Sequence, residues 1–252
     1  MVSEKIRAIL DINKKMGARK KESGSRFEGL VLAELDFDRV KHDYNRDGFV
    51  IIRGYLSVQE LTDLKGRAVP LANRLLAEEV DKVVFRNLLK SLNKHDEWFN
   101  NQLREGRHVP LINHLMDGDA VGASAAWFDR PKGENMGVEP HVDAIGEYKT
   151  AGAGATIWFA LDPVDAGNGC VHYLRGSQKN NYPYKTWVPS VDKESQDVFA
   201  AEMDPGDAVI HSANTVHWSG GNKTGQPRRA VTYFYLSRDA YTSYQKTGEK
   251  NE

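Results

Sequence analysis

The side chains best suited to chemistry lie in the run EPHVD at 139–143. Successive side chains of an extended strand point to opposite faces, so His141 and Asp143 are expected on one face. An imidazole and a carboxylate placed in this way can give a metal ion two neighbouring ligands. His217, which lies 76 residues further along in NTVHWSGGN, is the candidate for the third ligand. Two histidines and one carboxylate form the facial triad typical of non-haem Fe(II) sites, which leaves coordination positions open.

An arginine follows the second histidine at an informative spacing. Arg228 lies eleven residues beyond His217, at the start of the β-type run RRAVTYFYL. Its guanidinium can hold a carboxylate through two parallel hydrogen bonds. A His-x-Asp pair alone is weak evidence, because such pairs are common on surfaces. A dicarboxylate cosubstrate that chelates iron requires both a set of iron ligands and an arginine that binds its far carboxylate. O₂ is then the second reactant.

The segment AVIHSANTVH offers two distal histidines, His211 and His217. The spacing to Arg228 favours His217 as the ligand. We therefore expect His211 to be a packed, hydrogen-bonded strand residue near the site. The other five histidines have no partner at ligand spacing and are interpreted as structural or surface groups: His42, His95, His108, His114 and His172.

Composition limits the classes of protein that this chain can represent. It has 252 residues, with 34 Lys and Arg against 35 Asp and Glu, whereas a dedicated nucleic-acid-binding protein is usually visibly basic. Its single cysteine, Cys170, cannot form an internal disulfide and favours a reducing compartment. No apolar run reaches the roughly 20 residues that span a membrane. We expect a cytoplasmic protein with a small-molecule substrate, no nucleic-acid partner and no membrane segment.

The first half of the chain has mainly helical patterns. The run GFVIIRGYL at 48–56 predicts a short strand, and Ser57 with Glu60 forms a capping box that starts a helix running to about residue 80. Pro70 is expected to kink or interrupt this helix. Further helices are predicted over 82–92, 95–105 and 110–117.

From about residue 120 the pattern changes to short β-type runs separated by turn residues. These runs are VGASAAWFD, AGATIWFAL, CVHYL, AVIH and AVTYFYL. Closely spaced short strands without intervening helices indicate a sandwich or barrel, and the jelly roll is one such fold. We therefore predict a mainly β protein of the α+β class, with a helical N-terminal layer packed on a C-terminal β-structure.

Three segments are predicted along the chain. Residues 1–42 form an N-terminal helix and linker, 43–240 the main domain, and 241–252 a polar tail. Within the first segment, residues 4–26 carry eight Lys and Arg against three acids. This basic helix is expected to lie on the main domain, with a partner or subunit contact as the alternative.

The C-terminal half resembles the phytanoyl-CoA dioxygenase (PhyH-like) family of 2-oxoglutarate oxygenases. The resemblance runs in order through EPHVDA, TIWFALDPVDAGNGCVHYLRGSQK and GDAVIHSANTVHWSGGNKTGQPRRAVTYFYL, and more weakly through DGFVIIRGYLS. It covers roughly 43–238. It implies a double-stranded β-helix core, which is a cupin-like jelly roll, with Fe(II) and O₂ as cofactors and 2-oxoglutarate as cosubstrate.

The resemblance also implies roles for individual residues. His141, Asp143 and His217 match the iron ligands. Four further residues match the surroundings of 2-oxoglutarate: Arg228 pairs with its distal carboxylate, Ser219 assists Arg228, Trp158 flanks the cosubstrate, and Arg130 stands where some members, such as ectoine hydroxylase, have a lysine.

The chain departs from the family pattern in two further places. Gln178 stands where the family often has histidine in a Gly-Ser-His run. The stretch 80–108 matches no family pattern and is a candidate for shaping the substrate pocket.

The expected function is that of an Fe(II)- and 2-oxoglutarate-dependent dioxygenase that hydroxylates a small or mid-sized metabolite, with release of succinate and CO₂. Asp143 speaks against a radical halogenase, in which a small residue leaves space for halide. One alternative is a cupin-like enzyme that uses a divalent metal without 2-oxoglutarate, against which Arg228 and Ser219 argue. The other is a non-catalytic ligand-binding barrel. The sequence predicts neither the substrate nor the oligomeric state.

Overall fold

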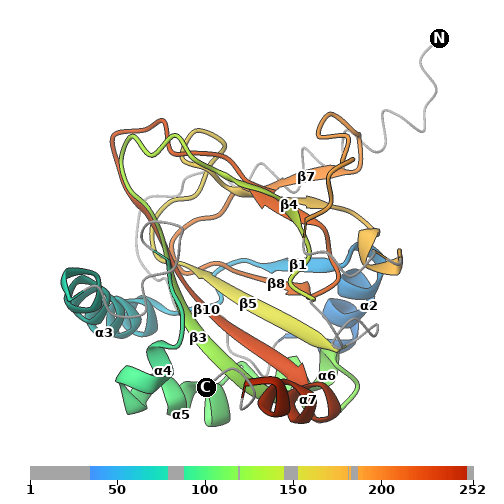
Figure 1. Cartoon of the computed structure of the whole chain (residues 1–252), viewed down its shortest axis with the longest axis horizontal. Helices are drawn as coiled ribbons and strands as arrows, with labels where there is room; N and C mark the ends of the chain where they lie inside the picture. The colour runs from blue at the N-terminus through green and yellow to red at the C-terminus, as the bar shows by residue number, and fades with distance from the viewer. Residues whose placement is uncertain are drawn as a thin grey trace.

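The computed structural model describes residues 35–78, 88–118, 120–144, 153–180, 182 and 187–248. Two antiparallel sheets form its core (Figure 1). The larger sheet has the order β1-β8-β5-β10-β3-β2, with strands Phe49–Ile52 (β1), Leu88–Leu89 (β2), Ala120–Arg130 (β3), Gly154–Ala160 (β5), Ala208–Ser212 (β8) and Arg228–Ser237 (β10). The smaller sheet has the order β4-β9-β6-β7, with strands Val138–His141 (β4), Val171–Leu174 (β6), Val198–Ala201 (β7) and His217–Ser219 (β9).

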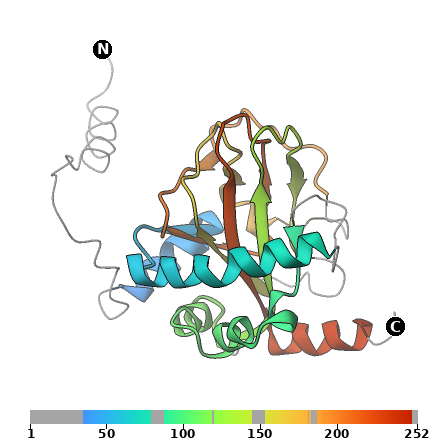
Figure 2. The ribbon, with the colours of Figure 1, turned by 90° about the vertical axis from the view of Figure 1, so that its left-hand side faces the viewer.

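The outer face of the larger sheet is covered by helices. These are Val58–Ala77 (α3), Leu92–His95 (α4), Glu97–Glu105 (α5) and Val109–Leu115 (α6), while Phe37–Asp47 (α2), a 3-10 turn at Ser177–Lys179 (η3) and Arg238–Gly248 (α7) complete the helical elements. Figure 2 shows α3 running across the strands of this sheet. Apolar side chains of α3, α5 and α6 pack in one buried cluster with outward residues of β5 and β10, among them Phe159 and Tyr233.

Alternation along the two central strands separates this helical layer from the interior. Phe159 and Val231 face the helices, whereas Trp158 and Ala230 belong to a second buried cluster that joins the two sheets. Residues two apart on a strand share a face, so β10 presents Arg228 and Thr232 to the space between the sheets. The predicted mainly β fold with a helical layer is confirmed.

Helix α3 begins at the predicted capping box. The Ser57 hydroxyl accepts a hydrogen bond from the Glu60 amide at 3.2 Å, and the Glu60 carboxylate accepts one from the Ser57 amide at 2.8 Å. The helix continues through Pro70 to Ala77, so the expected interruption does not occur. Pro70 lies on the exposed side of the helix.

Several local predictions need correction. The helix predicted over 82–92 is wrong at its end, because Leu88 and Leu89 form strand β2 beside β3. Helix α7, which includes residues 241–248 of the predicted polar tail, was not predicted from the sequence. The basic segment 4–26 lies outside the described residues. Within the described part of the chain, no helix is both long and apolar enough to cross a membrane.

Candidate metal centre

His141 and His217 face each other across a strand pair. Strand β4 lies antiparallel to β9 with His141 opposite His217, and the two ring centroids are 4.2 Å apart. The close approach of these strands depends on Gly137, where an added Cβ would lie 2.2 Å from the carbonyl oxygen of Ser219. Backbone pairing in the smaller sheet therefore brings together two imidazoles that are 76 residues apart in sequence.

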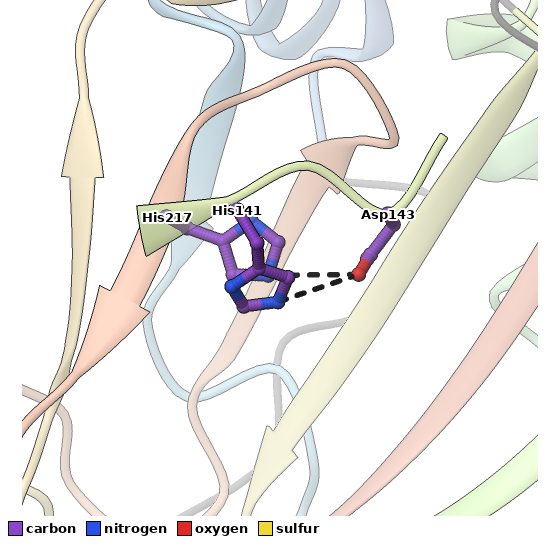
Figure 3. Close-up of side chains that lie close together, drawn as sticks. All are labelled: His141, Asp143 and His217. Carbon is purple, nitrogen blue, oxygen red and sulfur yellow. Dashed lines mark ion pairs between the residues drawn. The ribbon is translucent and has the colours of Figure 1, made fainter. Parts of the chain in front are cut away.

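Asp143 completes a three-residue group just beyond the end of β4. Its Oδ1 lies 3.8 Å from Nε2 of His141 and 3.7 Å from Nε2 of His217. Figure 3 shows both rings pointing toward this carboxylate. The three donor atoms lie within 4.8 Å of one another, and this is the one such group of His, Cys, Asp or Glu among the described residues.

Hydrogen bonds to the main chain fix the proton positions on both histidines. Nδ1 of His141 lies 2.8 Å from the Glu139 carbonyl, and Nδ1 of His217 lies 2.9 Å from the Thr215 carbonyl. A carbonyl only accepts, so each Nδ1 carries the hydrogen and each Nε2 presents a lone pair to the shared space. Burial lowers the pKa of His141 to about 4 and also lowers that of His217, which favours the neutral, metal-binding form.

His211 contacts the other oxygen of the carboxylate. Its Nε2 lies 3.1 Å from Asp143 Oδ2, and the Thr156 hydroxyl donates to the same oxygen at 3.2 Å. A carboxylate only accepts, so Nε2 of His211 carries hydrogen and has no lone pair for a metal. Burial tends to raise the pKa of Asp143, but His217 and His211 outweigh burial and hold the pKa far below its usual value.

Two buried guanidinium groups lie beside this group of ligands. Arg130 and Arg228 are register partners on β3 and β10, and they are 8% and 2% exposed. Arg130 donates to the Ser219 hydroxyl at 3.2 Å, whereas no hydrogen bond or ion pair joins the Arg228 side chain to any described residue. Burial and the charge of Arg130 lower the pKa of Arg228 to about 9. The Arg228 guanidinium carbon lies 5.5 Å from the ring centroid of Trp158.

The neighbouring arginine shows what a paired guanidinium looks like in this fold. Arg229 points to the opposite face of β10 and makes two hydrogen bonds to Asp162, at 2.7 and 2.8 Å. Arg228 thus lacks the anion that Arg229 has. A buried charge is costly unless it is paired, so Arg228, with Arg130 beside it, fits an anionic group of a ligand.

One cavity of about 370 Å³ joins the carboxylate, the histidines and the arginines. It is lined by all seven residues that the sequence singled out, His141, Asp143, His217, Arg228, Ser219, Trp158 and Arg130. Glu139 points away from it and forms a salt bridge with Lys193 at 2.9 Å. Gln178 is also outside it and donates to the Asn45 carbonyl.

Part of the cavity lining was not predicted residue by residue from the sequence. Leu88 and Lys90 lie within 80–108, the stretch that the sequence offered as a candidate for shaping the substrate pocket, whereas no motif pointed to Trp187. Tyr173 and Thr156 were detectable in principle. Each lies at an inward position of a predicted strand, and alternation from Trp158 places Thr156 on the same face.

The family model for phytanoyl-CoA dioxygenase (PhyH) matches residues 44–230. The chain belongs to the phytanoyl-CoA dioxygenase family. The peroxisomal phytanoyl-CoA dioxygenase of Homo sapiens is 28% identical over 240 residues, covering 88% of this chain and 68% of the relative. The dioxygenase ALT11 of Alternaria alternata is 24% identical over 231 residues, covering 82% of this chain and 74% of the relative.

The fold of this family member is shared with solved structures. The epimerase SnoN, solved in complex with Fe³⁺, alpha-ketoglutarate and nogalamycin RO, superposes with a TM-score of 0.67 at 20% identity, covering 80% of this chain and 83% of SnoN. The predicted family, jelly-roll fold and enzyme class, an iron- and 2-oxoglutarate-dependent dioxygenase, are confirmed. The roles of individual residues remain predictions.

Proposed function

We propose that this protein oxidises a small or mid-sized metabolite with Fe(II), 2-oxoglutarate and O₂, by hydroxylation, and releases succinate and CO₂. The observation that carries the proposal is the buried, unpaired Arg228 in the same cavity as His141, Asp143 and His217. A metal enzyme that uses no dicarboxylate has no need of a free guanidinium at that place. A cytoplasmic location, favoured by the single cysteine, stays a prediction.

In this proposal His141, Asp143 and His217 hold the metal. The two neutral Nε2 atoms and one carboxylate oxygen match the ligand types of the facial triad, and the donor set lacks the thiolates typical of structural zinc sites. When bound, Fe(II) supplies the activation of O₂ and the oxidising power that couples decarboxylation of 2-oxoglutarate to oxidation of the substrate. The protein positions the reactants and excludes water.

The arginines bind and orient the cosubstrate. The Arg228 guanidinium is proposed to take the distal carboxylate of 2-oxoglutarate, with Ser219 and Arg130 beside it and Trp158 flanking the chain of the molecule. Arg130 and Arg228 repel each other across neighbouring strands, and an anion between them relieves that repulsion. The hydrogen bond between the Arg130 guanidinium and the Ser219 hydroxyl keeps these two groups together in the cavity beside Arg228.

The dimensions of the cavity support a modest substrate. Ligand pockets generally enclose about 300–1,000 Å³, and this cavity of about 370 Å³ must hold 2-oxoglutarate as well as the reacting part of the substrate. Beyond the polar groups it is lined by apolar side chains, including Leu88, Phe128, Val138 and Trp187. An apolar reacting carbon is therefore expected near the metal position.

Binding of Fe(II) and 2-oxoglutarate together tests this function. Anaerobic addition of both to the purified protein is expected to give the weak visible absorption band of the chelate, and calorimetry should show that 2-oxoglutarate binds only with metal present. Absence of the band together with absence of 2-oxoglutarate binding would contradict the proposal. A screen of candidate metabolites that reads succinate formation then identifies the substrate class.

A further inference from the structure

The carboxylate of Asp143 lies between two sheets that play different parts. Its Oδ1 faces His141 and His217, which come from the smaller sheet. Its Oδ2 faces His211 and Thr156, which are register partners on β8 and β5 of the larger sheet. One oxygen is thus turned to the metal ligands, and the other is held by hydrogen bonds from the opposite sheet.

Among the described residues, few other contacts determine how this carboxylate is rotated. Asp143 follows the end of β4 and belongs to no strand. Next to Asp143, the Ala144 amide donates a main-chain hydrogen bond to the Ala213 carbonyl at 2.9 Å. That bond fixes the backbone but leaves rotation about the side-chain bonds free. The orientation of the carboxylate therefore depends on the groups that hold Oδ2.

The proton on His211 is determined from both sides. Its Nε2 carries hydrogen because the carboxylate only accepts. Its Nδ1 lies 3.0 Å from the hydroxyl of Tyr173, a residue with no exposed surface. The Tyr173 hydroxyl can donate to this Nδ1 when the ring hydrogen is on Nε2. Burial raises the pKa of Tyr173 well above its usual value, which keeps the hydroxyl protonated. The hydrogen bonds then run in one direction, from Tyr173 through His211 to Asp143.

We propose that His211 is a positioning residue that, with Thr156 and supported by Tyr173, commits Asp143 to the metal through Oδ1 alone. A carboxylate free to rotate can coordinate through both oxygens and occupy a further position, whereas the reaction needs open positions for 2-oxoglutarate and O₂. This inference rests on the proposed function, because it assumes a metal held by Asp143. It gives His211 a role beyond the packing that the sequence suggested.

Three variants separate positioning from packing. His211→Leu keeps an apolar side chain but removes the donor, whereas His211→Gln keeps an N–H at the place of Nε2. Tyr173→Phe removes only the distant hydroxyl. Metal affinity is measured by titration with Fe(II) under anaerobic conditions, and coordination is read from the visible spectrum of the Co(II) form. Thermal unfolding of the metal-free proteins shows whether each variant folds.

Loss of the Nε2 donor should weaken metal binding. We expect His211→Leu to lower Fe(II) affinity by about 10–100-fold, the usual effect of removing a group that orients a metal ligand, and to alter the Co(II) spectrum. His211→Gln should stay within a few-fold of wild type with an unchanged spectrum. Tyr173→Phe should have a smaller effect in the same direction, and no added effect on metal affinity in the His211→Leu background, since it acts through His211.

The results distinguish a positioning role of His211 from a packing role. Equal losses in His211→Leu and His211→Gln, or a wild-type affinity and spectrum in His211→Leu, would overturn the positioning role. If His211→Leu does not fold, Thr156→Val takes its place, because it removes the other hydrogen-bond donor to Oδ2. His211→Gln is then the variant with which Thr156→Val is compared. An unchanged Co(II) spectrum in Thr156→Val would then count against the proposal. Failure of the wild-type protein to bind Fe(II) with 2-oxoglutarate contradicts the proposed function itself, whereas wild-type binding with insensitive variants contradicts only this inference.

Discussion

The two faces of strand β10 carry neighbouring arginines in different surroundings, Arg229 half-buried on one face and Arg228 buried on the other. On the outward face, Arg229 meets Asp162 in a two-pronged pair, and the next outward residues pack under the helices. On the inward face, Arg228 is 2% exposed and meets no carboxylate among the described residues. Both arginines are adjacent residues of the same strand, so local sequence does not distinguish them. We infer from this difference that the outward arginine stabilises the protein, whereas the inward one is proposed to bind a ligand.

The largest expected effect is at the proposed metal ligands, which lie on the inward side. His217→Ala removes one of three protein ligands, so Fe(II) affinity should fall by more than the roughly 10–100-fold typical of changes in groups that only orient a ligand. The chelate band with 2-oxoglutarate should disappear. The exposed His42→Ala serves as the control, with full Fe(II) binding. A normal band in His217→Ala would show that another residue supplies the third ligand.

The second prediction compares the effects of replacing each of the two arginines by methionine. Arg228→Met should weaken 2-oxoglutarate binding by the roughly 2–5 kcal/mol typical of a buried charge pair, leave Fe(II) binding nearly intact, and raise the stability of the ligand-free protein, because an unpaired buried charge is removed. Arg229→Met should leave 2-oxoglutarate binding unchanged but cost about 0.5–1.5 kcal/mol of stability, because Asp162 loses two side-chain hydrogen bonds and keeps only the Arg229 amide and Lys65.

Calorimetry and denaturant unfolding of both variants measure these quantities. The comparison fails if Arg229→Met loses cosubstrate affinity, or if Arg228→Met destabilises the ligand-free protein as much as Arg229→Met does. Arg228→Lys is the matched intermediate. It keeps the charge but not the two-pronged geometry, so its 2-oxoglutarate affinity should lie between those of the wild type and Arg228→Met.

Much of this contrast could be predicted from the sequence. The spacing of His141, Asp143, His217 and Arg228 indicated the cavity because alternation fixes which side chains share a face. The short strands β3, β5, β6, β8 and β10 were detectable as β-type runs. Strand β2 was mistaken for helix because its two residues are held by pairing with β3, which is a tertiary contact that local propensity does not encode.

The role of His211 was less accessible from sequence. His211 and Asp143 are 68 residues apart, and only the packing of β8 against the end of β4 brings them together. Spacing to Arg228 favoured His217 over His211 as the ligand but gave no partner for His211. Helix α7 was missed because its residues, RDAYTSYQKTG, are mostly polar and resemble a tail.

The third prediction concerns acid sensitivity on the outward side. Burial, with a smaller contribution from the charge of Arg107, lowers the pKa of His108 from 6.5 to about 3. The folded protein keeps His108 neutral while the unfolded chain takes up a proton below about pH 6.5. The stability contribution is therefore fully present above that pH and is lost as the pH falls toward 3. Each pH unit in this window should cost about 1.4 kcal/mol from this residue.

His108→Gln tests this slope without removing the polar contact. The glutamine N–H can replace the bond of His108 Nε2 to the Tyr235 hydroxyl, which is 2.7 Å long. Denaturant unfolding between pH 4 and 7 should give a flatter dependence of stability on pH in His108→Gln than in the wild type. The exposed His42→Gln should retain the wild-type slope. Equal slopes in all three proteins would show that His108 does not titrate differently on folding.

The smallest effect is expected at the Ser219 hydroxyl, which contacts the inward Arg130. Ser219 accepts from Arg130 at 3.2 Å, and in the proposed function it also contacts the cosubstrate. Ser219→Ala removes one hydrogen-bonding group while both charges remain, so 2-oxoglutarate binding should weaken by about 0.5–1.5 kcal/mol, a factor of roughly 2–12. Ser219→Thr keeps the hydroxyl and should bind nearly as well as wild type. Calorimetry on the metal-loaded protein measures both. A loss in Ser219→Ala as large as that in Arg228→Met would mean that the hydroxyl, rather than the guanidinium, dominates anion binding on the inward face.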